Sequence, residues 1–142
     1  MSQSKITRKP LPIVDPVFAL IAEYKRLAKE FSHRRDAMQT VRSKEEKKLG
    51  NPLTRETILA VADATSSLWE AFNDAGRAKR KMGMRLARTM PTTPAGVAAL
   101  VQCTRRDIMV ENEKDGDVSD WSAIALKTAV DALTKMSAGA SQ

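Results

Sequence analysis

The sequence is poor in the residue types that most often carry chemistry. Cysteine and histidine occur once each, as Cys103 and His33. One cysteine excludes a disulfide within the chain, and one histidine excludes a metal site built on several histidines. A thiol nucleophile needs an activating base, and the only histidine is predicted on a different helix from the thiol. We therefore expect Cys103 to be a small buried apolar residue and His33 to be exposed.

Motifs that bind cofactors or metals are equally scarce. The glycines are scattered singly, so the sequence has no glycine-rich phosphate loop. Acidic residues crowd the segment 113–117, but the ligand pattern and closing glutamate of a calcium loop are missing, so we interpret it as a solvated turn. The sequence implies no cofactor, no metal and no small-molecule ligand, and it offers no set of catalytic residues. We predict that the chain is not an enzyme.

Long apolar runs are also missing. No segment approaches the roughly 18 apolar residues that indicate a membrane span, and residues 1–14 lack the apolar run of a signal peptide. Together with the single cysteine, this favours a cytoplasmic location. Aromatic residues make up only 4% of the chain, so we expect a core of aliphatic residues and methionine.

The sequence does contain clear helical periodicity. Asp15 and Pro16 form a cap followed by proline, and apolar residues then recur at three- and four-residue steps. Thr54 is a plausible cap for a second helix, which Pro91 ends, and a fourth helix begins near Ser119. The predicted helices cover about 15–48, 54–90, 94–113 and 119–136.

These helices predict an all-α protein with a single domain at 15–136. The first two are long and similar, and a short turn joins them, so we expect an antiparallel, coiled-coil-like hairpin. The two shorter helices are expected to fold back as a second hairpin that packs on one end of the first. Trp69 and Trp121 are candidate anchors because of their size. We interpret 1–14 as a flexible basic tail and 137–142 as a frayed tail.

One stretch of the second predicted helix is irregular. Lys79 lies inside the apolar stripe, so it must extend to solvent, pair with an acid or mark a local break. Gly76 and Gly83 flank it, and each costs a helix about 1 kcal/mol relative to alanine. We expect a kink or a frayed stretch between the two glycines.

Three stretches of the chain resemble a known group of proteins. They are the opening Asp15-Pro16-Val17-Phe18, the stretch Thr92-Thr93-Pro94-Ala95-Gly96-Val97-Ala98-Ala99-Leu100, and Trp121 before the final helix. The resemblance is to small all-helical proteins encoded widely in alphaproteobacterial genomes, rhizobia included, and it covers roughly 15–136. It implies a helical fold and a bacterial cytoplasmic protein. The group brings no activity, so no residue gains a role from it.

Charge is divided along the second predicted helix. The acids Glu56, Asp63, Glu70 and Asp74 lie opposite the apolar stripe, whereas residues 76–90 contain six bases and no acid. The basic part could be an anion-binding ridge for phosphate backbones. A solvated or self-pairing face is the favoured interpretation, because a helix dipole favours acids early and bases late. The candidate anion- or nucleic-acid-binding residues are Arg77, Arg80, Lys81, Arg85 and Arg88.

The net charge of +7 permits nucleic acid, an anionic surface or an acidic protein as partner. No aromatic residue interleaves with the basic positions to stack on bases. The last two predicted helices also make a poor helix-turn-helix, because Lys127 and Lys135 are offset by Asp120 and Asp131. The leading hypothesis is a helical interaction or structural module that binds an unknown protein or forms a homodimer. The alternative is non-specific nucleic-acid binding through the basic face.

Overall fold

The computed structural model describes residues 14–49, 54–112 and 120–140. These segments fold into four helices and contain no strand, which confirms the predicted all-α class. The expected basic tail, the turn after the first helix and the acidic turn lie almost entirely outside the described residues. The helices are α1 (Pro16–Leu49), α2 (Arg55–Arg88), α3 (Pro94–Asn112) and α4 (Asp120–Ala140).

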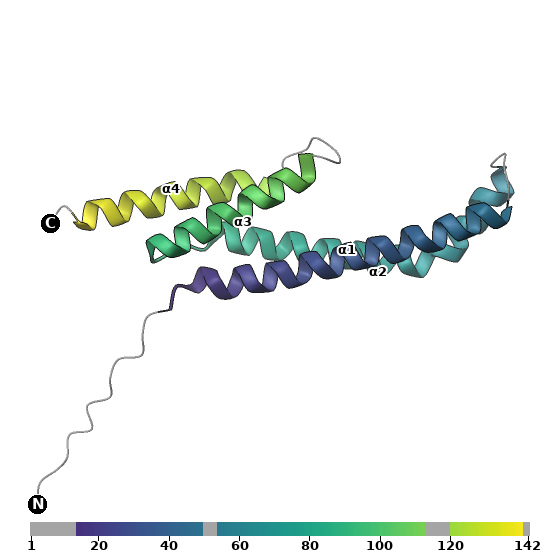
Figure 1. Ribbon diagram of the computed structural model, residues 1–142, viewed down its shortest axis with the longest axis horizontal. Coiled ribbons are helices and arrows are strands. Elements are labelled where there is room, and N and C mark those ends of the chain that lie inside the picture. Colours follow the sequence, from purple (N-terminus) through teal and green to yellow (C-terminus); the bar gives the residue numbers. More distant parts are fainter. Residues whose placement is uncertain (1–13, 50–53, 113–119, 141–142) are drawn as a thin grey trace, which may run out of the picture.

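Helices α1 and α2 lie side by side and run antiparallel, with the most extensive contact of any helix pair (Figure 1). Helices α3 and α4 form a shorter pair on the end where α1 begins and α2 ends. There α3 contacts α1, and α4 contacts α2 (Figure 1). At the other end no described helix covers the hairpin; we call residues 38–49 of α1 and 55–70 of α2 the free half.

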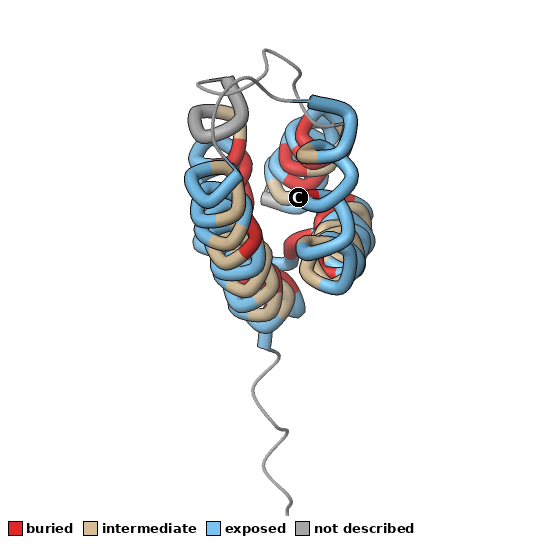
Figure 2. The backbone as a smooth tube through the Cα atoms, turned by 90° about the vertical axis from the view of Figure 1, so that its right-hand side faces the viewer, coloured by how far each residue is buried: buried red, intermediate tan, exposed pale blue. Residues whose placement is uncertain are grey.

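The hydrophobic core lies where the four helices meet, and Figure 2 shows buried backbone on the inner sides of both pairs. Trp121 is buried in it, as predicted, with its ring edge-on to Tyr24 at 5.1 Å between centroids. The prediction for Trp69 is wrong: 52% of this residue is exposed, because it lies in the free half. The core consists of Val17, Ile21, Tyr24, Leu86, Ala87, Val97, Leu100, Cys103, Trp121, Ala125, Ala129 and Ala132.

The start of α1 is fixed by Asp15, whose Oδ1 accepts a hydrogen bond from the Val17 amide at 3.1 Å. This confirms the predicted cap. The other oxygen, Oδ2, accepts from the amides of Thr92 and Thr93 at 3.0 and 2.9 Å and from the Thr93 hydroxyl at 2.8 Å. The buried carboxylate therefore also ties the start of α1 to the turn between α2 and α3, which the sequence pattern did not indicate.

Helix α2 runs without interruption from Arg55 to Arg88, so the expected frayed stretch is absent. Its glycines serve close packing instead. A Cβ atom on Gly76 would lie 3.1 Å from the Phe31 ring, and one on Gly83 would lie 3.0 Å from the Trp121 ring. A side chain at either position would push an aromatic ring away, so the rings use the space that the glycines leave.

The last helix extends further than predicted. Helix α4 ends at Ala140, so residues 137–140 are helical rather than frayed. This segment contains two alanines and no proline, which allows the helix to continue. Within the described ranges, none of the helices has an apolar stretch long enough to cross a lipid bilayer.

Candidate functional site

The basic residues that the sequence singled out lie together on the outer side of α2. Arg77, Arg80, Lys81, Arg85 and Arg88 are all exposed. With Met84 and Thr89 they line one shallow hollow of about 650 Å³. The structure therefore brings the five predicted residues into one surface, which we call the basic ridge.

Within the described ranges, most of the basic ridge has no acidic partner. Arg77 forms an ion pair with Asp74 one turn earlier. Among the residues that the structure describes, the other four ridge residues form no ion pair. Their charge is therefore available to an anion or an acidic surface from outside the chain.

Lys79 is the one base of this stretch that does not face solvent. Its Nζ atom lies 3.7 Å from Oδ1 of Asp107 on α3, and the Tyr24 hydroxyl donates a hydrogen bond to the same oxygen. The ammonium group also lies 5.9 Å from the ring centroid of Tyr24 and 5.2 Å from that of Phe31. Pairing with an acid is thus the outcome that the structure shows for Lys79, and this residue is separate from the basic ridge.

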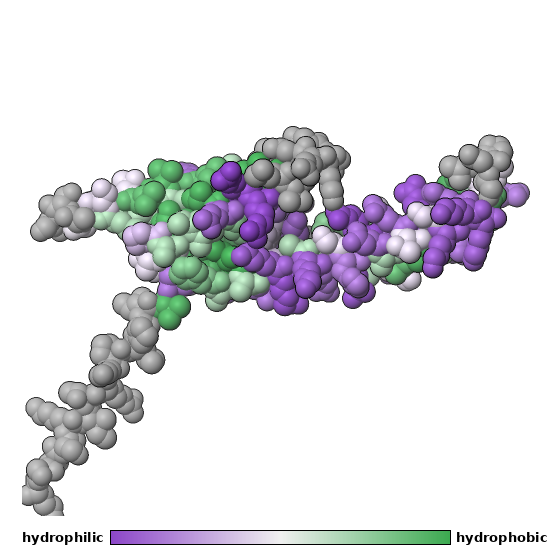
Figure 3. All heavy atoms as spheres, viewed as in Figure 1, coloured by the Kyte–Doolittle hydropathy of each residue, from purple (hydrophilic) through white to green (hydrophobic). Residues whose placement is uncertain are grey.

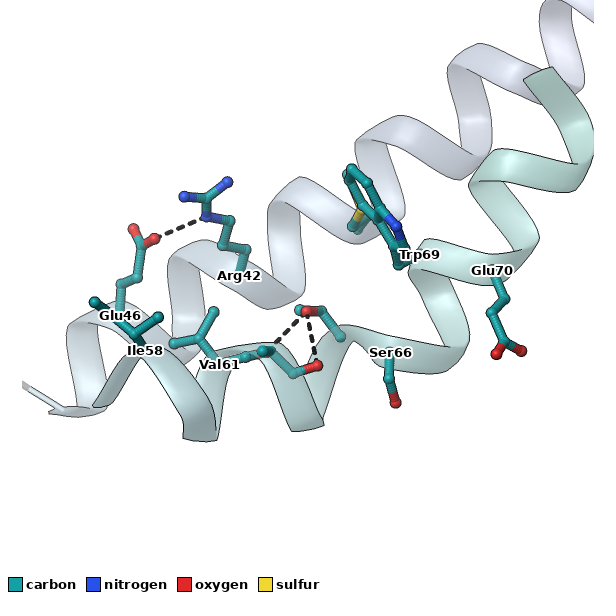
Figure 4. A pocket seen from close by; sticks show the side chains of 10 residues that line it. Arg42, Glu46, Ile58, Val61, Ser66, Trp69 and Glu70 are labelled. Atoms are coloured by element: carbon teal, nitrogen blue, oxygen red, sulfur yellow. Dashed lines mark hydrogen bonds and ion pairs between the residues drawn. The ribbon is translucent and has the colours of Figure 1, made fainter. Parts of the chain in front are cut away.

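A second surface, which the sequence analysis missed, is an apolar groove in the free half (Figure 4). It has a volume of about 500 Å³ and lies between α1 and α2. Trp69 and Ile58 line it and are 52% and 55% exposed. At its edge, Arg42 donates a 2.9 Å hydrogen bond to Glu46. The groove is lined by Met38, Arg42, Glu46, Ile58, Val61, Ala62, Thr65, Ser66, Trp69 and Glu70.

The groove lies on a flank of α2 that α4 covers near the other end of the helix. Helix α4 packs on α2 at Gly83, which contacts Trp121, and at Ala87, whose carbonyl accepts a 2.6 Å hydrogen bond from Thr128. At about 100° per residue, Gly83 and Ala87 lie on the same flank of α2 as Ile58, Ala62 and Trp69. This flank is therefore covered by α4 at one end and open to solvent at the other.

Helix length could have revealed the open flank from sequence. Helices α1 and α2 have 34 residues each, or about 51 Å, whereas α3 and α4 have 19 and 21 residues, or about 30 Å. Two short helices packed at one end cannot cover the whole hairpin. A tryptophan near the far end was consequently more exposed than its size suggested.

The surface between α1 and α3 also contains titratable groups. Burial raises the pKa of the Cys103 thiol, and the charge of Asp107 raises it further. The thiol is therefore protonated at neutral pH, which fits the expected buried apolar role. His33 is exposed on α1, as predicted. In the described part of the chain, no group of three or more potential ligands is arranged to hold a metal ion.

Comparison with protein-family models, curated proteins and solved structures gives no significant match. The resemblance to small alphaproteobacterial helical proteins therefore stays a prediction.

Proposed function

We propose that the chain is a non-enzymatic helical interaction module that uses the apolar groove of the free half to bind a protein partner. The observation that carries the proposal is the exposure of Trp69 and Ile58 in a groove between two helices. Exposed apolar grooves of this kind accept an amphipathic helix, and tryptophan is enriched among the residues that dominate binding energy.

The exposed apolar area of the groove is large enough to contribute substantially to the free energy of binding. Covering the exposed parts of Trp69 and Ile58 would remove roughly 200 Å² from water, worth about 5 kcal/mol at 25 cal/mol per Å². Part of this gain is offset by the freedom that two molecules lose on association. A partner that also contacts the surrounding residues could therefore bind stably.

Helix α4 offers a further apolar strip that supports the same function. Leu126, Val130 and Leu133 recur at four- and three-residue steps and are 42%, 60% and 49% exposed. Figure 3 shows apolar side chains gathered over α3 and α4, whereas the visible face of the free half is mainly hydrophilic. The free half thus has a mainly hydrophilic face besides the apolar groove, and a polar rim around an apolar centre is typical of a specific contact.

Capture of partners from a lysate of the source cells tests whether the groove is the binding site. The variant I58S/W69S should lose the partners that the wild-type chain retains, while both chains give the same circular dichroism spectrum. The matched control is L59S, because Leu59 is 59% exposed but does not line the groove. Retention of every partner by I58S/W69S would contradict the proposal.

Non-specific nucleic-acid binding is the second candidate function. It is favoured by the four ridge residues that have no ion pair in the described chain. From Arg77 to Arg88 the ridge spans about 16 Å of helix. Five neutralised phosphates would give a log–log salt slope of about −4.5 on duplex DNA. A gel-shift titration at low salt should show a complex that R80E/R85E abolishes; no complex with the wild type would exclude this candidate.

A further inference from the structure

We infer that the partner of the hairpin is a second copy of this chain, paired antiparallel through the outer face of α2. The inference rests on the proposed interaction function and names its partner. It comes from the arrangement of charge on α2, which is complementary to itself in one orientation.

The outer face of α2 is a narrow strip of charge. Eight exposed charged residues fall within an arc of roughly 80° at about 100° per residue. This arc lies opposite the side that buries Ala75 and Leu86. We call it the charged face; its members are Glu56, Asp63, Glu70, Asp74, Arg77, Lys81, Arg85 and Arg88.

The two halves of the charged face have opposite sign, and the change occurs between Asp74 and Arg77. A parallel pair of copies would place each charged residue opposite a residue of the same charge. An antiparallel pair places the acidic half of one copy against the basic half of the other. Since like charges facing each other cost several kcal/mol, only the antiparallel orientation is favoured.

The spacing of the charges also defines a register. A twofold axis between Ala75 and Gly76 places Asp74 opposite Arg77 of the partner subunit. The same axis places Glu70 opposite Lys81 of the partner subunit, and Asp63 opposite Arg88 of the partner subunit. The symmetry repeats each pair, and the contact from Asp63 to Arg88 extends over about 38 Å of helix. Arg85 faces Ser66 of the partner subunit, so no like charges oppose each other.

Ion pairs at a surface contribute about 0.2–1 kcal/mol each, so they select the register more than they hold the dimer. The apolar groove adjoins this contact, because Glu70 lines the groove and also belongs to the charged face. In the same register Trp69 lies level with the segment between Arg80 and Met84 of the partner subunit, and all three positions share one flank of α2. A tryptophan ring there can contact a guanidinium and a thioether, both favourable. The hollow of the basic ridge would thus receive the edge of the partner's groove.

Two charge-reversal variants test the pairing. D63K/E70K/D74K makes the charged face almost entirely basic, and R77E/K81E/R88E makes it almost entirely acidic. By sedimentation equilibrium we expect the wild-type chain to be a dimer and each variant alone to dimerise at least about 100-fold more weakly. An equimolar mixture of the two variants should form a heterodimer, because one basic face then meets one acidic face.

The matched control is K29E/K44E/K127E, which changes the net charge as much as R77E/K81E/R88E does, at exposed positions outside the charged face. It should remain a dimer. The wild-type dimer should also dissociate more readily as NaCl rises from about 0.05 to 1 M, which tests the pairing even if a variant fails to fold.

Three results would overturn the inference: a wild-type chain that is monomeric at 0.1 mM, two variants that each remain dimeric, or a dimer that is unaffected by salt. A folded pair of variants that stays monomeric when mixed would overturn it as well. A monomeric wild type that still captures another protein through Trp69 would leave the proposed function standing. Loss of both self-association and groove-dependent capture would remove both.

Discussion

At the scale of single residues, Asp15 contributes to two separate parts of the fold. Its carboxylate caps α1 through Val17 and accepts three hydrogen bonds from the turn at Thr92 and Thr93. Burial alone would raise the pKa of Asp15, but the hydrogen bonds from Thr93, Val17 and Thr92 outweigh it, so the pKa lies below its ordinary value. The charged form is therefore the one that holds these segments together.

Asp15→Ala should lower the free energy of unfolding by about 2–4 kcal/mol, because it removes both a cap and hydrogen bonds to a charged group. Asp15→Asn should cost less and also reduce the dependence on pH. A lowered pKa gives stability that is complete above the unfolded pKa, about 3.9, and is lost as the pH falls through the folded pKa. Urea denaturation between pH 5 and pH 2 measures this. The exposed control Asp131→Ala should change the free energy of unfolding by no more than about 0.5 kcal/mol.

Gly96 makes the close approach of Asp15 to the turn possible. A Cβ atom at this position would lie 1.8 Å from Oδ2 of Asp15, which has no room to retreat while it keeps its hydrogen bonds. Gly96→Ala should therefore destabilise the protein by at least about 2 kcal/mol, although alanine is the better helix former. Gly139→Ala is the matched control, because nothing lies within 4 Å of its added Cβ atom. Equal melting temperatures for the two variants would contradict this explanation.

Some of these residue roles could be predicted from the sequence and others could not. The cap role of Asp15 followed from its position before Pro16, because a cap is a local feature. Its contact with Thr92 and Thr93 did not follow, since it joins residues far apart in the chain. The exposure of Trp69 was missed for a similar reason: size predicts burial only where another element is present to cover the side chain.

At the scale of elements, the Lys79–Asp107 pair connects α2 to α3. Lys79→Met keeps the length of the side chain but leaves the buried Asp107 carboxylate without the ammonium group. We expect a loss of about 2–4 kcal/mol in the free energy of unfolding, since breaking a buried pair from one side is costly. Arg80→Met, on the exposed side of the same turn, should change the stability by no more than about 0.5 kcal/mol. Guanidinium denaturation of both variants tests the difference.

The packing of α2 against α4 leads to a second prediction at this scale. Gly83→Val should displace the Trp121 ring, because even a Cβ atom would lie 3.0 Å from it. In a Trp69→Phe background, the fluorescence of the remaining tryptophan should shift to the red as it gains contact with water. An unchanged emission maximum would show that the ring is held by other contacts.

The sequence predicted the elements better than their contacts. Capping residues and apolar periodicity placed all four helices to within a few residues at each end that the structure describes. The frayed stretch expected between Gly76 and Gly83 was wrong, because propensity alone cannot show that an aromatic ring fills the space beside a glycine. Arg77, Lys81, Arg85 and Arg88 were expected on one face of the helix, and they line one hollow together with Arg80, because exposure on a long helix follows from its periodicity.

At the scale of the whole molecule, the hydrophobic core lies at one end of an elongated hairpin (Figures 1 and 2). In the free half, Met38 and Val61 are the buried large apolar residues among the described positions. Few buried contacts mean that this half opens locally at a low free energy when nothing covers it. At the end that holds α3 and α4, the free energy of opening should approach that of global unfolding.

The central claim is that a second copy covers the outer face of α2 in solution, which amide hydrogen exchange tests directly. We predict that residues 63–70, the part of the free half that the pairing covers, exchange rapidly at about 1 µM protein and become at least about 10-fold slower at about 1 mM. Residues around Leu100 on α3, in the core and outside the pairing contact, should be protected equally at both concentrations. Exchange at residues 63–70 that does not change with concentration, in a chain that remains monomeric, would contradict the pairing.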